Sequence, residues 1–404
     1  MTVPHHNAAR RSQLTLPEFI ALFALITSLT ALSIDTMLPA LPVIGEALGL
    51  VDMRDTQLIV SMVILGMVAG ELFAGPLSDA LGRRPVILAG IAVYCLGAVL
   101  AMVAQSIEML LFARFIQGIG VSGPKIASRA LIRDRFEGDG MARIMSLIIM
   151  IFILVPAIAP ALGQVILLVA DWRAIFLVFL ILGAVVAVWF GLRQEETLPQ
   201  SARRPFRPMT ILKDAGGLLG HRIVMAYTLS AGLIFGSLLL FLSTAPHVFR
   251  DLYGIEENFP IYFAALALGI GFAGMVNSKL VLRVGARRLS LIALVNQIIC
   301  GSVLLWLGQA HGGVPPLSAF MILMFLLFAG LGCLFGNLNA LAMRPLGHMA
   351  GLGASFIASF SSIMAFLTAT LIGRFYDGTV WPLAAGFLGT SILALIAMRV
   401  GRHS

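Results

Sequence analysis

Long apolar runs of about 20 residues, separated by short polar stretches, repeat along the whole chain. A helix crosses a hydrocarbon layer of about 30 Å with about 20 residues, because it rises 1.5 Å per residue. By this measure the pattern predicts an all-α integral membrane protein with twelve transmembrane helices. The predicted spans are 17–40, 57–77, 86–104, 108–131, 142–168, 174–192, 222–246, 259–282, 289–308, 316–342, 350–372 and 381–399.

Composition agrees with this pattern and removes several classes of protein. Hydrophobic residues make up 59% of the 404 positions and charged residues 11%, and the mean hydropathy is +1.00. A soluble core of this size would need more surface charge. The three cysteines all fall in apolar runs, where they are expected to be small core residues. No P-loop motif and no metal-ligand spacing is visible, and "GIGVSG" (118–123) lies inside a predicted span, where its glycines favour helix packing over dinucleotide binding.

The distribution of Lys and Arg predicts the orientation. With the N-terminus inside, the inner loops, tails and helix ends hold 21 of the 27 basic residues, the outer loops hold four, and two lie within a span. This asymmetry follows the positive-inside rule, so both chain termini are expected to be cytoplasmic. It also explains the net charge of +8 without nucleic acid, since no patch of cations interleaved with aromatic residues is present.

The polar segment 193–221 divides the predicted spans into six before it and six after it. It contains three prolines and is predicted to be a cytoplasmic linker between an N-terminal bundle (1–192) and a C-terminal bundle (222–404). The two halves resemble each other weakly: "GRRPVIL" (82–88) is echoed by "ARRLSLI" (286–292), and "LPVIGEALGL" (41–50) by "APHVFRDLYGI" (245–255). These echoes indicate a duplicated six-helix unit, as in transporters built from repeats.

A short charged turn, "GPLSDALGRRP" (75–85), joins the second and third predicted spans. Its glycines allow close approach and unusual backbone angles. Asp79 can face the start of the third span, where an anion is favoured, or pair with Arg83 or Arg84. The turn is either a contact that holds helices together in one conformation or an ordinary positively charged inner turn.

Ionisable residues inside spans are costly and therefore candidates for function. Asp35 lies six residues before the outer end of the first span near Leu41, and Arg114 lies six residues after Glu108, where the fourth span begins. Both are about 9 Å deep at 1.5 Å per residue. An acid and a base at one depth predict a pair, which either takes part in proton coupling or is a static structural contact.

A second acid and base also share a depth. Lys125 follows Arg114 by eleven residues, or about three turns, so both side chains lie on one face of the fourth span. Glu71 precedes Asp79 by eight residues, and Lys125 precedes Arg133 by eight. The geometry predicts a Glu71–Lys125 pair, with Glu71 a further candidate for proton coupling. The alternative is that each side chain extends separately toward water.

Two motifs in the first half resemble those of a known family. The charged turn resembles the loop 2–3 signature of the major facilitator superfamily, G-x-x-x-D-R/K-x-G-R/K-R/K, with Ala80 where a basic residue is usual. The matching residues are Gly75, Asp79, Gly82, Arg83 and Arg84. "RFIQGIG" in the fourth span resembles the R-x-x-Q-G-x-G motif of drug/proton antiporters. Its matching residues are Arg114, Gln117, Gly118 and Gly120.

A third motif, in the fifth span, is degraded. "VPAIAPALGQ" keeps Pro160 and Gly163 of the antiporter pattern G-x-x-x-G-P-x-x-G-G but has Val155, Ala159 and Gln164 where glycines are usual. With "SIDTMLPALP" in the first span and "FLSTAPHVF" in the seventh, the chain is similar over its whole length to the bicyclomycin/chloramphenicol-resistance (Bcr/CflA) branch.

This resemblance implies two pseudo-symmetric six-helix bundles around a central site, and proton-driven export of small hydrophobic drugs across the bacterial inner membrane. Asp35 would be the proton carrier with Arg114 as its partner, and the charged turn would be a latch. The resemblance implies no cofactor beyond the proton gradient. The expected partners are a small-molecule substrate, protons and membrane lipid, with no nucleic acid, and we expect a monomer.

Six residues are candidates for the substrate cavity: three phenylalanines in the seventh and tenth spans, which the resemblance places at the cavity, two asparagines that are polar in mid-span, and the lysine of the predicted pair. They are Lys125, Phe235, Phe241, Phe335, Asn337 and Asn339. An exporter of a physiological metabolite on the same fold is the main alternative. A membrane enzyme or receptor is a more distant one, because no nucleophile–base or metal constellation is visible in the spans, and we expect no enzyme activity.

Overall fold

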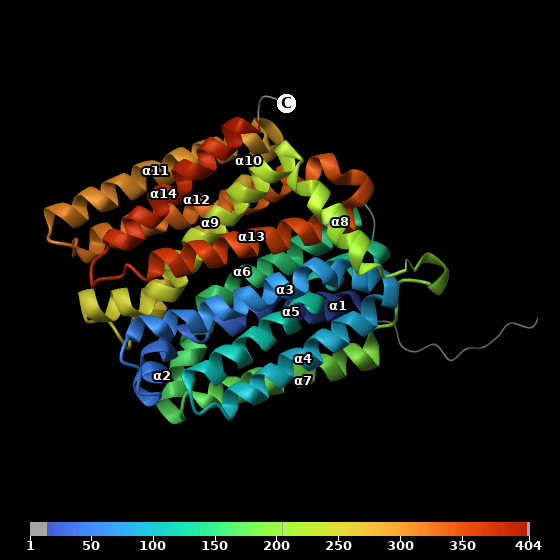
Figure 1. The fold of residues 1–404 in the computed structure, drawn as a ribbon, viewed down its shortest axis with the longest axis horizontal. Coiled ribbons are helices and arrows are strands. Elements are labelled where there is room, and N and C mark those ends of the chain that lie inside the picture. Colours follow the sequence, from blue (N-terminus) through green and yellow to red (C-terminus); the bar gives the residue numbers. More distant parts are fainter. Residues whose placement is uncertain (1–13, 137, 204, 402–404) are drawn as a thin grey trace, which may run out of the picture.

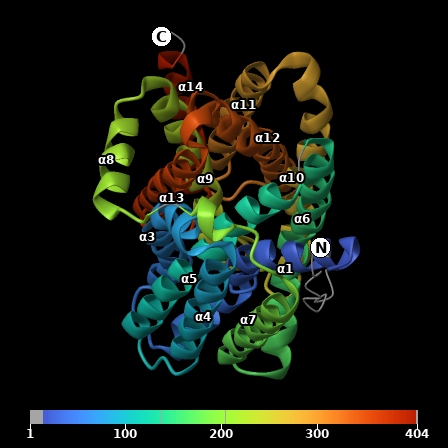
Figure 2. The same cartoon turned by 90° about the vertical axis from the view of Figure 1, so that its right-hand side faces the viewer.

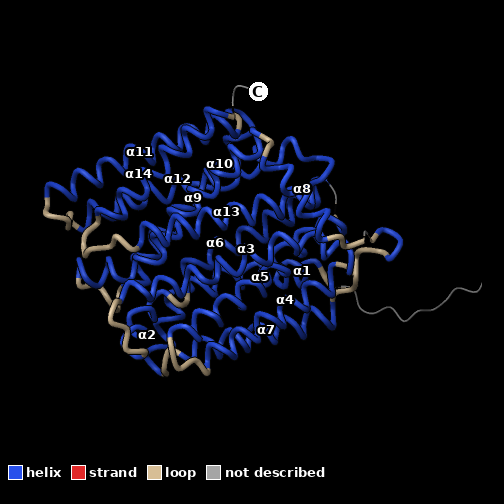
Figure 3. Tube along the Cα trace, viewed as in Figure 1, coloured by secondary structure: helices blue, strands red, loops and turns tan. Residues whose placement is uncertain are grey.

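The computed structural model describes residues 14–136, 138–203 and 205–401. Within these ranges every regular element is helical, and no strand occurs (Figures 1 and 3). The prediction of an all-α protein is therefore confirmed. The N-terminal tail and the last three residues, both expected to be cytoplasmic, lie outside the described residues.

The twelve long helices among the described residues correspond to the twelve predicted spans. They are α1 (Leu16–Asp35), α3 (Gln57–Leu81), α4 (Arg83–Met102), α5 (Ile107–Arg135), α6 (Gly138–Val169), α7 (Arg173–Arg193), α9 (Arg222–His247), α10 (Phe259–Val284), α11 (Ala286–Ala310), α12 (Leu317–Met343), α13 (Ala350–Gly373) and α14 (Trp381–Val400). The shorter elements are η1 (Leu38–Ala40), α2 (Leu41–Ala47), η2 (Met53–Thr56), η3 (Gln200–Ala202), α8 (Pro208–Leu219), η4 (Val248–Leu252) and η5 (Arg344–Met349).

The long helices form two bundles, one from each half of the chain (Figure 2). In the first half, α5 packs against α3 and α4, α4 packs against α7, and α1 packs against α6. In the second half, α9 packs against α12, α13 and α14, and α12 packs against α10 and α11. The halves meet along two seams, α3 against α13 and α6 against α10, on opposite sides of the molecule in Figure 2.

Corresponding turns of the two halves share an unusual backbone conformation. Gly82, between α3 and α4, has φ 106° and ψ 159°, and Gly285, between α10 and α11, has φ 88° and ψ 144°. Both values lie in a region that side chains rarely adopt, which explains why glycine ends each helix there. The echoed sequences begin at or directly after these two glycines, so the likeness between the halves extends to their backbone.

Ten described helical segments are long and apolar enough to cross a membrane, and Val155–Val169 is a shorter apolar one. The protein is therefore a multi-pass membrane protein. Helix α5 is not among the ten, although it has 29 residues, because it carries acids and bases along its length, including Arg114 and Lys125.

The first predicted span extends beyond the helix that the structure shows, and the predicted linker contains a helix. The first span was predicted over 17–40, but α1 ends at Asp35 and the chain turns at Thr36 before η1 and α2. The prolines at positions 39 and 42 remove two backbone donors from a continuous helix. The linker was predicted over 193–221, between α7 and α9, without a helix of its own. The structure shows that it contains α8, whose Ile211, Ala215 and Leu218 are buried at helical spacing.

The two ends of the bundle are distinguished by their basic residues. The end that carries the Asp79–Arg84 turn and the 193–221 linker is called the basic end. The end that carries Arg54 and Arg250 is called the far end. Helix α8 lies at the basic end, on the right in Figure 1, where it packs against α3, α9 and α13.

Candidate functional site

Arg83 is the centre of a polar cluster at the basic end. Its side chain is 5% exposed, and its guanidinium donates to the carboxylate of Asp79, to Asp134 Oδ2 at 3.0 Å and to Ser78 Oγ at 2.8 Å. One buried cation therefore joins the end of α3 to the end of α5. Asp79 therefore pairs with Arg83, one of the two arginines that were predicted as its partner.

The backbone of the same turn is fastened to the end of α7. Glu196 accepts from the backbone N–H of Arg83 and of Arg84, each at 3.0 Å, and Arg84 Nη2 donates to the carbonyl of Gly191 at 2.5 Å. A β-carbon at Gly82 would meet the Glu196 carboxylate. These contacts involve only the first half and the start of the linker, so they hold α3, α4, α5 and α7 together independently of the second half.

The turn also meets the second half, through α13. A β-carbon at Gly75 would overlap Ser355 Oγ, and one at Gly351 would lie 3.4 Å from Asp79 Oδ2. Gly351 is in the first turn of α13, so the Asp79 carboxylate faces the N-terminal end of that helix, where an anion is stabilised. Nearer the middle of the seam, Ser359 Oγ donates to the Val68 carbonyl at 3.0 Å.

Arg114 is fully buried, but its guanidinium does not pair with Asp35. It donates to the carbonyls of Ser33 at 2.7 Å and Ile59 at 3.2 Å, and to Gln117 Oε1 at 2.5 Å. No ion pair between Asp35 and Arg114 is formed in this structure, although both residues are described. The prediction of a direct pair is therefore wrong here. Backbone carbonyls of α1 and α3 satisfy the arginine instead, and one of them is only two residues before Asp35.

Asp35 is the last residue of α1 and is 4% exposed. Within the described part of the chain, its carboxyl group has no ion-pair or hydrogen-bond partner. The sequence located a buried acid correctly but not its surroundings, because depth along a helix does not determine which way a side chain points.

The glycines of the fourth-span motif allow helices to approach closely. A β-carbon at Gly118 would overlap the Val63 carbonyl of α3, and one at Gly120 would meet the backbone of Tyr94 in α4. In α6, Pro160 is buried, and a β-carbon at Gly163 would overlap the carbonyl of the residue that follows Asp35. These contacts agree with the packing role that the motifs suggest.

Glu71 and Lys125 form the predicted pair. Lys125 Nζ lies 2.5 Å from Glu71 Oε1, the Glu71 side chain is fully buried, and the Lys125 side chain is 23% exposed. The other carboxylate oxygen of Glu71 accepts from Ser362 Oγ of α13 at 3.0 Å. The pair was predictable from depth and face, but Ser362 was not, because no sequence pattern relates α3 to α13.

The predicted aromatic residues of the cavity separate into two environments. Phe235 and Phe335 are half-buried and meet edge to face at 6.3 Å between ring centroids. Phe241 is fully buried against Phe263 and Phe328 in the core of the second half, so its inclusion among cavity residues is corrected. Phe235 and Phe241 are six residues apart and so point about 120° apart on α9.

The two predicted asparagines of α12 also differ. Asn337 is buried and exchanges two amide hydrogen bonds with Asn277 of α10, at 2.8 and 3.1 Å. Asn339 is exposed and donates to the carbonyl of Phe335 in its own helix, so it does not share the Asn337 environment. Asn277 was missed, although its polar side chain in a predicted span was a visible signal.

At the far end, polar contacts join the two halves. Thr56 Oγ1 is 3.0 Å from His247 Nε2, Arg250 pairs with Glu46 at 3.0 Å, and Arg374 pairs with Asp55 at 3.5 Å. His247 is 6% exposed. These partners come from different halves, so any opening between the halves at this end must break them.

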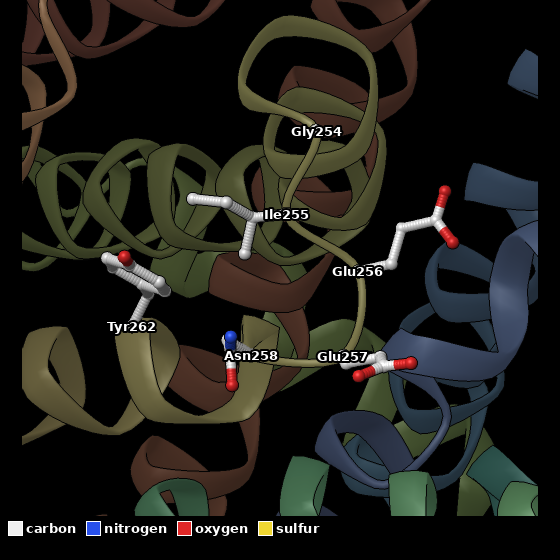
Figure 4. A pocket seen from close by; sticks show the side chains of 6 residues that line it. All are labelled: Gly254, Ile255, Glu256, Glu257, Asn258 and Tyr262. Atoms are coloured by element: carbon white, nitrogen blue, oxygen red, sulfur yellow. The ribbon is translucent and has the colours of Figure 1, made fainter.

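A pocket of about 350 Å³ lies in the far-end loop before α10 (Figure 4). It is lined by Gly254, Ile255, Glu256, Glu257, Asn258 and Tyr262. Figure 4 shows both glutamates extending toward the helices of the first half, and Glu256 pairs with Arg250 at 3.2 Å. None of the predicted site residues lines this pocket. No cluster of three or more potential metal ligands occurs among the described residues.

Comparison with known proteins agrees with the fold and with the motifs. A protein of Bacillus subtilis (strain 168), "Uncharacterized MFS-type transporter YdgK", is 31% identical over 99% of this chain and 100% of its own length. The "Bicyclomycin resistance protein homolog" of Haemophilus influenzae is 28% identical over 94% of each chain. The crystal structure of a D-xylose-proton symporter superposes with a TM-score of 0.71, at 14% identity, over 94% of this chain and 97% of that one.

The family model described as Major Facilitator Superfamily matches residues 23–369, which include the charged turn, the fourth-span motif and both helix seams. The bicyclomycin-resistance relative confirms the branch that these motifs resemble. With two six-helix bundles, buried charges inside the spans and these relatives, the chain belongs to the major facilitator superfamily of membrane transporters.

Proposed function

We propose that the protein is a proton-coupled antiporter that exports small hydrophobic drugs. It would act as a monomer in the bacterial inner membrane, with its basic end and both chain termini in the cytoplasm. The drug-export part is supported by the relative that is named for bicyclomycin resistance. The orientation is supported by the concentration of Lys and Arg at the basic end.

The observation that carries the proton-coupled part is the environment of Asp35. Its carboxyl group is 4% exposed, inside a membrane-spanning segment, and without an ion-pair or hydrogen-bond partner among the described residues. An unpaired anion in such a place is costly, and a bound proton removes the charge. Asp35 is therefore our candidate for the group that carries the proton.

Arg114 supplies a means of coupling this proton to helix movement. It holds the backbone of α1 at Ser33, two residues from Asp35. A small movement of the end of α1 would let the Arg114 guanidinium release the Ser33 carbonyl and bind the Asp35 carboxylate instead. In that second state Asp35 would be ionised, so the proton occupancy of the site would differ between the two conformations, as antiport requires.

The test uses wild-type protein in proteoliposomes. A pH gradient that is acidic on the far-end side should drive neutral drugs such as chloramphenicol or bicyclomycin into the compartment that the far end faces, against their own concentration gradient. Dissipating the gradient with a protonophore should stop the uphill movement. Accumulation that continues after the protonophore, or downhill movement only, would contradict proton coupling.

A further inference from the structure

The Glu71–Lys125 pair lies at a different level of the membrane from Asp35. Glu71 is ten residues before the end of α3 at Leu81, or about 15 Å from the basic end of that 25-residue helix. Asp35 ends α1 near the other side. The pair is therefore a second polar site, close to the middle of the seam between α3 and α13.

The two oxygens of the Glu71 carboxylate are bound by different halves. Oε1 is held by Lys125 of α5, and Oε2 accepts from Ser362 of α13, whose side chain is 2% exposed. The neighbouring contact between Ser359 and the Val68 carbonyl lies on the same seam. Glu71 thus lies at the boundary between the two bundles.

Lys125 is the cation in direct contact with the Glu71 carboxylate. A fully buried carboxylate inside a span needs a counter-cation, and a lipophilic cation passing between the halves would be a suitable one. Lys125 supplies that cation from within the protein. Arg129, one turn further along α5, is exposed and interacts electrostatically with Glu71, so the surroundings carry more positive than negative charge.

We infer that Lys125 is an internal counter-cation that occupies Glu71 and so excludes lipophilic cations, which makes neutral molecules the preferred substrates. This inference rests on the proposed function in one respect: both take the substrate path to lie between the two halves. It deepens that function, because it assigns the charge selectivity of the exporter to one lysine rather than to Asp35.

The test measures binding to purified protein in detergent, without a gradient. The probes are tetraphenylphosphonium and tetraphenylborate, which have nearly the same shape and opposite charge. For Lys125→Met, the ratio of the two affinities should move at least tenfold toward the cation. For Glu71→Gln, which leaves Lys125 unpaired, the ratio should move at least tenfold toward the anion. The double variant should return to the wild-type ratio.

Two controls separate charge from packing. Ser359→Ala removes a hydrogen bond across the same seam without touching Glu71 or changing the charge, and it should leave the ratio unchanged. The set is repeated in an Arg129→Gln background, so that a second cation cannot replace Lys125. If Lys125→Met does not fold, Glu71→Gln still tests the inference from the opposite direction.

Equal ratios in the wild type and every variant that folds would overturn the inference. Because no pH gradient is involved, that result would leave the proposed proton coupling standing. Conversely, a failure of gradient-driven export by the wild type would not change the binding ratios.

Discussion

Replacing Asp79 by Asn tests whether the charged turn acts as a latch between the halves. The change keeps the shape of the side chain and removes its charge. The ion pair with Arg83 lies within the first half, so its loss weakens both conformations alike. Only the approach of Asp79 to the first turn of α13 at Gly351 differs when the halves separate.

The size of the effect follows from that contact. An anion at a helix N-terminus contributes about 0.3–1 kcal/mol. Because the Asp79 side chain is 31% exposed, we take a value of about 0.5 kcal/mol, which is roughly a twofold change in an equilibrium. An ion pair broken between the halves would instead change it by about tenfold or more. We therefore expect Asp79→Asn to lower the transport rate by about twofold while the protein remains in the membrane.

The assay combines transport with accessibility of the seam. A cysteine at Ser355, in a protein whose native cysteines have been replaced, should react about twice as fast with a maleimide when Asp79 is Asn, since Ser355 lies against Gly75 in the closed seam. Asp134→Asn is the matched control, because it removes the other acid bound to Arg83 without facing α13. Identical effects of the two variants, or none from Asp79→Asn, would refute the latch and leave only a structural turn.

Three further experiments test topology and packing. A membrane-impermeant thiol reagent applied to intact cells should label a cysteine at Asn258 and miss one at Ser201; the reverse pattern would invert the orientation. Gly118→Ala should lower the free energy of unfolding by about 1–3 kcal/mol, seen as a lower melting temperature in detergent, because its β-carbon would overlap the backbone of α3. Gly216→Ala, at an exposed position of α8 with open space around it, should not lower the melting temperature. Gly82→Ala should cost about 1–3 kcal/mol because of its backbone angles, and an unchanged melting temperature would show that the turn can relax.

The sequence predicted the architecture well because the membrane limits the choices. A spanning segment must satisfy its own backbone hydrogen bonds, so run length and Lys/Arg placement predict helices and orientation directly. Glu71 and Lys125 could be paired from their common depth, and their helices α3 and α5 pack against each other.

The remaining features depend on contacts that no local pattern encodes. The partner of Arg114 is a backbone carbonyl of α1, and carbonyls are present at every position, so the sequence could not single one out. Ser362 reaches Glu71 from 291 residues away. Phe241 was predicted to line the cavity only because it lies in the seventh span. The packing of α9 shows that its side chain lies on the side of the helix that faces the core of the second half. By contrast, the helical spacing of the apolar residues Ile211, Ala215 and Leu218 was visible in the sequence and indicated helix α8.

The central claim is that Asp35 carries the proton that drives export. The most direct measurement is uphill drug accumulation, together with drug-induced proton release, by Asp35→Asn in proteoliposomes under an imposed pH gradient. Glu257→Gln, which neutralises an exposed acid of the far-end loop, is the control. We predict that Asp35→Asn abolishes both signals while drug binding survives, because an amide keeps hydrogen-bonding capacity but cannot titrate, and that Glu257→Gln behaves like the wild type. Full proton-coupled accumulation by Asp35→Asn would contradict the account and move the proton site elsewhere, with Glu71 as the next acid to test.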